Sequence, residues 1–190
     1  MNPQDYIADL VAHEGCIPWL YCDSLGFVTI GIGNLVAKFS DTIALPLAHA
    51  DGTPATDEEK TKAWYKVFGT FNRHATTHLP AAGYKGLTDL RITQDYAETL
   101  AEARLVKEFL PGLMKVFNSF AGFPMNARRG LVDMIYNLGV GRFTNEFPKF
   151  IAAVRDGRWT DAAAECHRSS CRDERNDWTK SLFASCGEQS

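Results

Sequence analysis

The hydrophobic pattern changes its period early in the chain, and this change constrains the fold more than any other feature of the sequence. Before it, Tyr6, Ile7 and Leu10 recur at the spacing of one helix face. After it, apolar and polar residues alternate along residues 27–33, which is typical of a half-buried strand. The chain therefore begins with an amphipathic helix that leads directly into a β-structure.

The first helix carries signals at both ends. Asn2 is a favoured N-cap residue, and Pro3 suits the first helical position because no amide hydrogen is needed there. Gly15 is the residue type that most often ends a helix, because it readily adopts the left-handed conformation. We therefore expect Glu14 at the C-terminal end of this helix, where the helix dipole disfavours a further negative charge.

Residues 17–33 predict a β-hairpin, because two extended runs flank the turn residues 24–26. Side chains alternate between the two faces of a strand, so the apolar residues of the second run share one face. Thr29, Gly31 and Gly33 share the other face, where Thr29 carries the one hydroxyl group. The glycines leave that face without side chains, so we expect a bulky polymer to approach the backbone closely there.

The rest of the sequence has mostly helical patterns. Residues 36–55 contain prolines and glycines typical of a loop, and Thr56 or Asp57 can cap a helix that we expect to reach about Leu79. Further helices are predicted from Thr93 towards Pro111, from Pro124 to Leu138, and over Asn145–Arg155, Trp159–His167 and Asp177–Ala184. The predicted fold class is α+β and mostly helical, with a small N-terminal hairpin lobe beside a larger helical lobe.

Composition excludes several functional classes. The 190 residues are 45% hydrophobic and 23% charged, which suffices for a domain with an apolar core. The net charge of −3 lacks the basic excess of a nucleic-acid-binding protein, so no nucleic acid is expected as a partner. No run approaches the roughly 20 apolar residues of a membrane span. The first residues lack the pattern of a signal peptide, so we expect synthesis in the cytoplasm.

Cysteine and histidine residues suggest two further possibilities. Five cysteines, an odd number, argue against a fully paired secreted framework, and we expect reduced thiols. Cys16 and Cys22 flank the predicted hairpin, however, and could pair after export. His74 and His78 lie one helical turn apart and could share a metal ion, although exposed surface histidines are the simpler interpretation.

Glu14 and Asp23 are the candidate catalytic carboxyl groups. Hydrolysis of a glycosidic bond usually uses two of them: one donates a proton to the leaving oxygen, and the other activates water or attacks the sugar. Asp23 enters the hairpin turn, and the Thr29 hydroxyl could hold a water molecule between Asp23 and a substrate. Each residue alone has a simpler structural explanation, since a helix-end glutamate is usually solvated and an aspartate often caps a turn.

The combined spacing of these residues resembles a known family. Asp23 follows Glu14 by nine residues and Thr29 follows Asp23 by six, and the last of these opens the run Thr29-Ile30-Gly31-Ile32-Gly33. This pattern resembles the signature of glycoside hydrolase family 24, the T-even phage lysozymes. Further similarity lies in Ile92-Thr93, Arg128–Gly139, Phe143-Thr144-Asn145, Arg158-Trp159 and Arg175-Asn176. The resemblance covers the first 35 residues and about 92–183.

The resemblance implies a single lysozyme-like domain over residues 1–190, with an active-site cleft between two lobes. Residues 14–91 would form the hairpin lobe, including an extra helical insert at about 36–91. Residues 1–13 and 92–190 would form the helical lobe.

The resemblance also implies roles for individual residues. Glu14 would be the general acid, Asp23 the general base that orients and activates water, and Thr29 would help to place that water for attack with inversion. Arg175 would hold Glu14 by an ion pair. The residues expected to contact sugar or peptide are Gly31, Gly33, Asn137 and Thr144. Asn34 departs from the family, which often has histidine at this position.

The implied activity is that of a muramidase acting on the β-1,4 bond between N-acetylmuramic acid and N-acetylglucosamine in peptidoglycan. We expect a monomer that requires no metal or organic cofactor. It would act in the periplasm or cell wall after holin-dependent release or secretion. Two alternatives are a secreted antibacterial effector with the same chemistry, whose partner would be an immunity protein, and a non-catalytic glycan-binding module.

Overall fold

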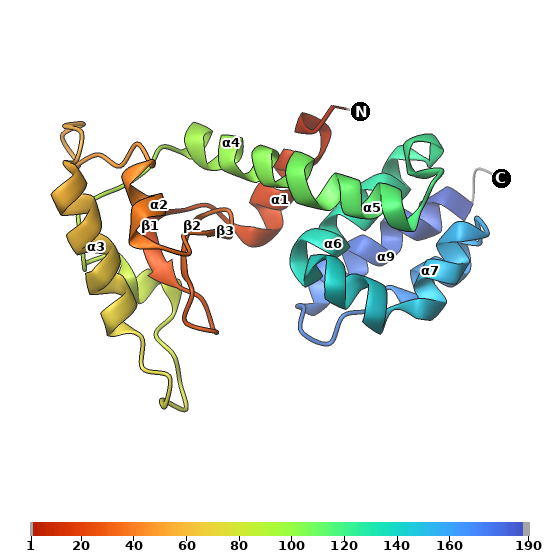
Figure 1. The fold of residues 1–190 in the computed structure, drawn as a ribbon. Coiled ribbons are helices and arrows are strands. Elements are labelled where there is room, and N and C mark those ends of the chain that lie inside the picture. Colours follow the sequence, from red (N-terminus) through yellow and green to blue (C-terminus); the bar gives the residue numbers. More distant parts are fainter. Residues whose placement is uncertain (1, 188–190) are drawn as a thin grey trace. The chain divides into compact units, whose positions relative to one another are not determined.

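The computed structural model describes residues 2–187 and has the predicted α+β, mostly helical fold (Figure 1). Met1 and residues 188–190, which are the ends of the expected domain range, lie outside the described residues. The chain divides into two compact units. We call Glu14–Glu102 the hairpin unit, and Met1–His13 with Ala103–Ser190 the helical unit. None of the helices within residues 2–187 combines the length and apolarity needed to cross a bilayer.

An antiparallel sheet in the order β1-β2-β3 forms the centre of the hairpin unit. β1 (Ile17–Cys22) and β2 (Val28–Gly31) are the predicted hairpin. β3 (Asn34–Leu35) was not predicted, because the alternation was expected to continue to Gly33. Gly31 and Gly33 instead adopt positive φ angles of 66° and 68°, which are accessible to glycine and turn the chain from β2 into β3.

Helix α3 (Asp57–Thr70) packs against this sheet. It begins as predicted at Thr56, whose side chain accepts a hydrogen bond from the amide of Glu59 in a capping box. The thiol of Cys22 in β1 donates to the carbonyl of Val67 at 3.6 Å, which joins strand and helix. The predicted end at Leu79 is wrong, because the next residue after Thr70 is already extended and the chain then turns.

The segments that connect α3 to the sheet are mostly irregular, as predicted for residues 36–55. They include the short helix α2 (Phe39–Ile43) and the 3₁₀ turn η1 (Ala81–Tyr84). The indole of Trp64 in α3 donates to the carbonyl of Val36 at 3.0 Å, and Ala48 and Arg91 exchange backbone hydrogen bonds of 3.0 and 2.8 Å. These bonds hold the irregular segments of the insert to α3 and to one another.

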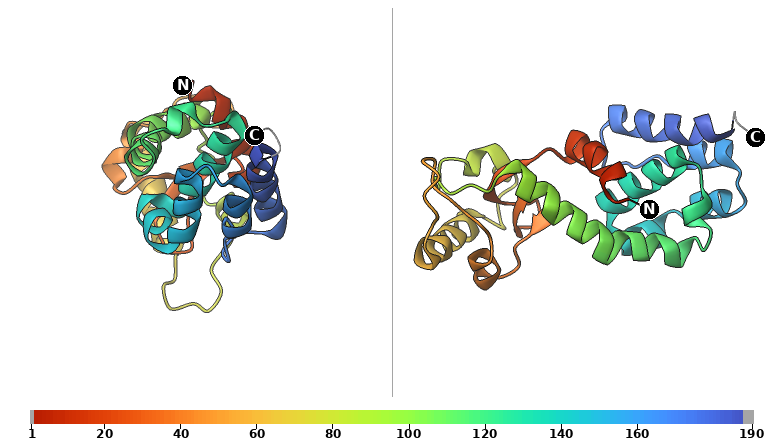
Figure 2. Two further views of the ribbon diagram at one scale, coloured as in Figure 1. Left: turned by 90° about the vertical axis from the view of Figure 1, so that its right-hand side faces the viewer. Right: turned by 90° about the horizontal axis from the view of Figure 1, so that it is seen from above.

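Helix α4 (Gln94–Arg104) begins after Thr93, whose hydroxyl accepts from the amide of Tyr96 at 3.2 Å, as the predicted cap requires. The boundary between the units lies within α4, after Glu102, whereas the sequence placed the lobe boundary after residue 91. The helical ribbon continues through a π-helical turn, η2 (Leu105–Phe109), into α5 (Leu110–Val116), as Figure 2 shows. Pro111 follows the π-helical turn directly and lacks an amide hydrogen, so it cannot donate to a carbonyl of the preceding turn.

The helical unit is built around α6 (Met125–Glu146), which is buried along most of its first half. Gly139, with φ 74° and ψ 159°, interrupts α6 at the predicted end of the helix. Gly130 has no side chain because the ring of Phe183 occupies that space, 2.7 Å from where a Cβ would lie. The elements around α6 are α1 (Gln4–Glu14), η3 (Phe120–Gly122), α7 (Pro148–Arg155), α8 (Trp159–Glu165) and α9 (Asp173–Gly187).

No disulfide links the five cysteines, all of which lie within residues 2–187. Cys16 and Cys22 lie at opposite ends of β1, and an extended segment of this length separates their Cα atoms by roughly 20 Å. A disulfide requires Cα atoms within about 7 Å. The alternative that these two residues pair after export is therefore incompatible with the sheet.

Candidate functional site

Asp23 is fixed by the hairpin turn that it begins. Its Oδ1 accepts hydrogen bonds from the amides of Leu25 and Phe27, both at 2.9 Å. Its backbone amide donates to the carbonyl of Phe27 at 3.0 Å, and its carbonyl accepts from Gly26 at 3.0 Å. Within residues 2–187, Oδ2 receives no hydrogen bond. The turn therefore orients the carboxylate and leaves one oxygen for a ligand.

Thr29 lies on the same face of the hairpin as Asp23. Tyr21 pairs with Thr29 across the two strands, and paired residues of an antiparallel ladder share a face. Asp23 follows Tyr21 by two residues and so lies on that face too. Thr29 is only 5% exposed, and its hydroxyl donates to the carbonyl of Phe27 at 3.0 Å. Its oxygen can still accept a hydrogen bond from a water molecule.

Tyr21 links the two candidate carboxyl groups. Burial, and then the negative charges of Glu14 and Asp23, raise the pKa of Tyr21 to about 12. The two carboxylates therefore both influence the pKa of this phenol. Gly15 makes this possible, because its φ of 72° ends α1 and directs the chain into β1. Tyr21 was not predicted as a site residue, because an aromatic residue in a strand has many possible roles.

Gly31 does not leave the open face that the sequence suggested. A Cβ built on Gly31 would lie 3.1 Å from Cβ of Ala97 in α4 and 3.5 Å from Cδ1 of Ile92. Ala97 and Ile92 fill the space that a side chain at position 31 would occupy. The expectation that a polymer approaches the backbone closely is therefore wrong at Gly31. A Cβ on Gly33 would have no neighbour within 4 Å, and the surface beside Gly33 is open.

Asn137 and Thr144 lie in the helical unit, on the two sides of the Gly139 interruption in α6. The Oδ1 atom of Asn137 is buried and accepts no hydrogen bond from residues 2–187. The Thr144 hydroxyl lies 3.0 Å from the carbonyl oxygens of both Val140 and Gly141, so its hydrogen is used within the helix. Because Oδ1 of Asn137 is buried, it does not face a ligand directly, whereas the Thr144 oxygen can accept a hydrogen bond. Their contact with a substrate stays a prediction.

Arg175 belongs to a buried ionic network that was not predicted. Its centre is Asp133, which is 1% exposed in the middle of α6. Nε and Nη2 of Arg175 donate to Oδ1 of Asp133 at 2.9 and 2.7 Å. The other contacts of this carboxylate are with Arg168 Nη2 (2.9 Å), His13 Nδ1 (3.0 Å) and Thr179 Oγ1 (3.2 Å). The ion pair between Arg175 and Glu14 joins residues of different units and stays a prediction.

The charge of Asp133 is strongly favoured by this network. Burial alone would raise the pKa of Asp133, because it disfavours a charged group. The hydrogen bonds of His13 and Arg175, together with the positive charges of Arg168 and Arg175, outweigh burial and hold the pKa well below its usual range. The one signal in the sequence was an acidic residue between the apolar neighbours Val132 and Met134.

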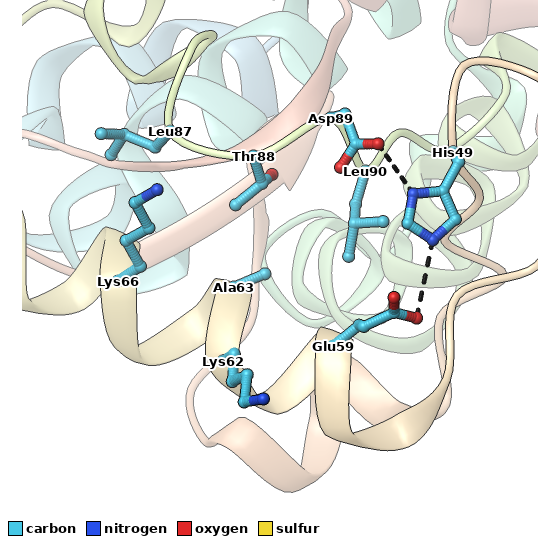
Figure 3. A pocket seen from close by; sticks show the side chains of 9 residues that line it. All are labelled: His49, Glu59, Lys62, Ala63, Lys66, Leu87, Thr88, Asp89 and Leu90. Carbon is cyan, nitrogen blue, oxygen red and sulfur yellow. Dashed lines mark hydrogen bonds and ion pairs between the residues drawn. The ribbon is translucent and has the colours of Figure 1, made fainter.

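A second cluster of ionisable residues lies in the insert, around a pocket of about 240 Å³ (Figure 3). Nδ1 of His49 lies 2.7 Å from Oδ2 of Asp89, and Nε2 lies 3.5 Å from Oε2 of Glu59. Figure 3 shows the imidazole between the two carboxylates. Each ring nitrogen faces a carboxylate, so the protonated, positively charged form of His49 is favoured. Neither nitrogen is then available to accept a proton from a catalytic nucleophile. This arrangement is a clamp between segments of the hairpin unit.

This clamp predicts a small dependence of stability on pH. The hydrogen bond to Asp89 is the main cause that raises the pKa of His49. A raised pKa means that the stabilisation is complete below the ordinary value of about 6.5 and is lost as the pH rises through the higher folded value. Loss of this stabilisation should lower the melting temperature by no more than a few degrees as the pH rises through the folded pKa. In His49→Gln, this contribution to the decrease should be absent. A series of thermal melts from pH 5 to 9 on both proteins would measure this, and parallel curves would contradict it.

The described residues contain no group of three or more histidine, cysteine, aspartate or glutamate side chains placed to hold a metal ion. His74 and His78 were considered as a metal pair because of their helical spacing. They lie after the end of α3, in irregular chain, so that spacing no longer brings them to one face. The ring of His78 stacks on Phe71 instead, with 4.7 Å between centroids.

Comparison with known proteins gives no family assignment. No protein-family model matches the chain, and no curated protein shows significant similarity to it.

Proposed function

We propose that this protein is a muramidase that resembles glycoside hydrolase family 24 and cleaves the β-1,4 bond between N-acetylmuramic acid and N-acetylglucosamine. The observation that carries the proposal is the hairpin turn that orients Asp23 and leaves its Oδ2 for a ligand, on the face that Thr29 shares. The negative charges of Glu14 and Asp23 both contribute to the raised pKa of Tyr21. Thr29 is paired with Tyr21 on the same hairpin face and adds a hydroxyl group. Glycoside hydrolysis usually requires two carboxyl groups that flank the bond to be cut, and Glu14 would be the second.

In the proposed reaction, Glu14 donates its proton to the glycosidic oxygen as the bond to the anomeric carbon breaks. A water molecule is held between Oδ2 of Asp23 and Oγ1 of Thr29. Asp23 accepts one proton of this water as its oxygen bonds to the anomeric carbon. Oδ1 of Asp23 already accepts two amide hydrogens, so Oδ2 is the oxygen left for this task. Attack by water on the face opposite the leaving group inverts the anomeric configuration.

Residues of the helical unit complete the proposal. Asn137 and Thr144 would contact sugar or peptide, with Thr144 as acceptor only. Arg175 would hold Glu14 while its other donors remain on Asp133. We propose that the substrate is reached in the periplasm or cell wall, after holin-dependent release or secretion, and that the enzyme acts as a monomer.

Mass spectrometry of digested peptidoglycan tests the bond that is cut. We expect soluble fragments that end in reducing N-acetylmuramic acid, and their first-formed anomer in NMR should be α, as inversion of a β-link requires. Released stem peptides would indicate an amidase, and reducing N-acetylglucosamine ends would indicate a glucosaminidase. Binding to cell walls without any soluble product would favour the glycan-binding module.

A further inference from the structure

Phe71, the first residue after α3, packs directly onto the hairpin turn. A Cβ built on Gly26 would lie 2.5 Å from Cε1 of the Phe71 ring and 2.6 Å from Cδ1. The space of a side chain at position 26 is therefore filled by this ring. The segment after α3 and the loop between β1 and β2 meet at this contact, within the hairpin unit. The insert thus touches the turn that carries Asp23.

The ring of Phe71 also contacts His78. His78 stacks on it nearly parallel, with an angle of 21° between the rings. The chain between the two residues turns back on itself, and the side chain of Asn72 accepts from the amide of His74 at 3.0 Å. The ring of Phe71 is therefore in contact with Gly26 of the turn and with His78 of the following segment, and a shift of the ring would disturb both contacts.

The turn transmits this contact to Asp23. Gly26 has a φ of 84°, in the left-handed region, and its amide donates to the carbonyl of Asp23. The amides on either side of Gly26, those of Leu25 and Phe27, are the donors that hold Oδ1 of Asp23. A shift of Gly26 therefore moves both donors and reorients the carboxylate.

We propose that Phe71, in contact with His78, is a positioning residue for Asp23, so that one function of the insert is to hold the carboxylate that activates water. This inference rests on the proposed function, because it assigns the insert a part in that reaction. Phe71 acts through the turn and need not touch the substrate.

Steady-state kinetics of Phe71→Ala on soluble peptidoglycan fragments test this inference. We expect kcat to fall by about 10- to 100-fold, because misplacement of a reacting group by about 1 Å costs this much, while KM changes little. Phe71→Tyr keeps the ring and should restore most of kcat. The matched control is Phe68→Ala, one turn earlier in α3, whose ring stacks on Trp64 at 4.9 Å. The control should retain wild-type kcat.

Hydrogen exchange of the folded protein provides a second test that does not depend on activity. In Phe71→Leu, we expect the amides of Leu25 and Phe27 to exchange faster by roughly tenfold, while amides in the middle of α3 keep their rates. Unchanged kcat in Phe71→Ala, or unchanged exchange in Phe71→Leu, would overturn the positioning role. Inactive wild-type protein would refute the proposed function instead, and faster exchange would then still show that Phe71 holds the turn.

Discussion

Replacement of Glu14 with glutamine is expected to abolish lysis of bacterial cell walls and to leave the fold intact. Glutamine has almost the same shape but cannot donate a proton to the leaving oxygen, and general acid catalysis contributes about 10²–10⁴-fold to such a step. The end of α1 does not depend on Glu14, because Gly15 makes the turn with its positive φ. The core contacts of this helix come from Tyr6, Ile7 and Leu10, which are buried.

The decrease in turbidity of chloroform-permeabilised Gram-negative cells measures the activity, and circular dichroism with a thermal melt measures the fold. Glu58→Gln is the matched control, because Glu58 is 75% exposed on α3 and pairs with Lys62. Asp23→Asn should be nearly as damaging as Glu14→Gln, although the asparagine oxygen can still accept from the amides of Leu25 and Phe27. Wild-type lysis by Glu14→Gln would reject the catalytic assignment.

Features fixed by local chemistry were predicted from the sequence. Gly15 and Gly139 end helices because glycine adopts positive φ without steric cost, and Thr56 caps α3 because its hydroxyl reaches a free amide. These interactions involve residues within a few positions of one another. The hairpin itself, with Asp23 at its turn and Thr29 in its second strand, was also predicted, because alternation and turn residues are local signals.

Features that depend on contacts between distant residues were missed. Gly31 was expected to leave a free surface, but Ala97 in a later helix fills the space. The pairing of Tyr21 with Thr29 depends on an irregularity between Ile17 and Tyr21 in β1, which alternation alone does not reveal. The contact of Phe71 with the hairpin turn likewise joins residues that are far apart in the sequence, so no local pattern could indicate it.

Asp133 was the most consequential omission, because four segments of the chain contribute to its environment. Asp133 lies in a segment that was predicted to be helical. A single acidic side chain in such a helix is compatible with a position exposed to solvent. The structure places it at the centre of a charged network with Arg168, which is 0% exposed. Only the fold shows that the partners of Asp133 come from α1, α9 and the chain between α8 and α9.

Replacement of Asp133 with asparagine is expected to destabilise the protein by about 3–5 kcal/mol, the usual effect of removing one partner from a buried ion pair. The positive charge of Arg168 would remain buried, with the hydroxyl of Thr179 as its nearest neutral acceptor at 2.7 Å. For a chain of this length, the loss corresponds to a decrease of roughly 6–20 °C in melting temperature. A thermal melt at neutral pH measures it directly.

The same network predicts how stability varies with pH. Because the pKa of Asp133 is lowered in the folded state, its stabilising contribution is complete above the ordinary value of about 4 and is lost only as the pH falls through the lower folded value. The difference in melting temperature between wild type and Asp133→Asn should therefore stay constant from pH 5 to 8. It should shrink in strong acid, where the wild-type carboxylate also takes up a proton.

Asp9→Asn is the matched control for this prediction. Asp9 accepts two hydrogen bonds of 2.7 Å from Arg129, and it joins α1 to α6 in the same unit. These side chains are 17% and 32% exposed, so water compensates the charges when the pair is broken, and we expect a loss of about 1 kcal/mol or less. Equal decreases in the free energy of unfolding for Asp133→Asn and Asp9→Asn would mean that burial does not set the energy of the Asp133 network, and would contradict this prediction.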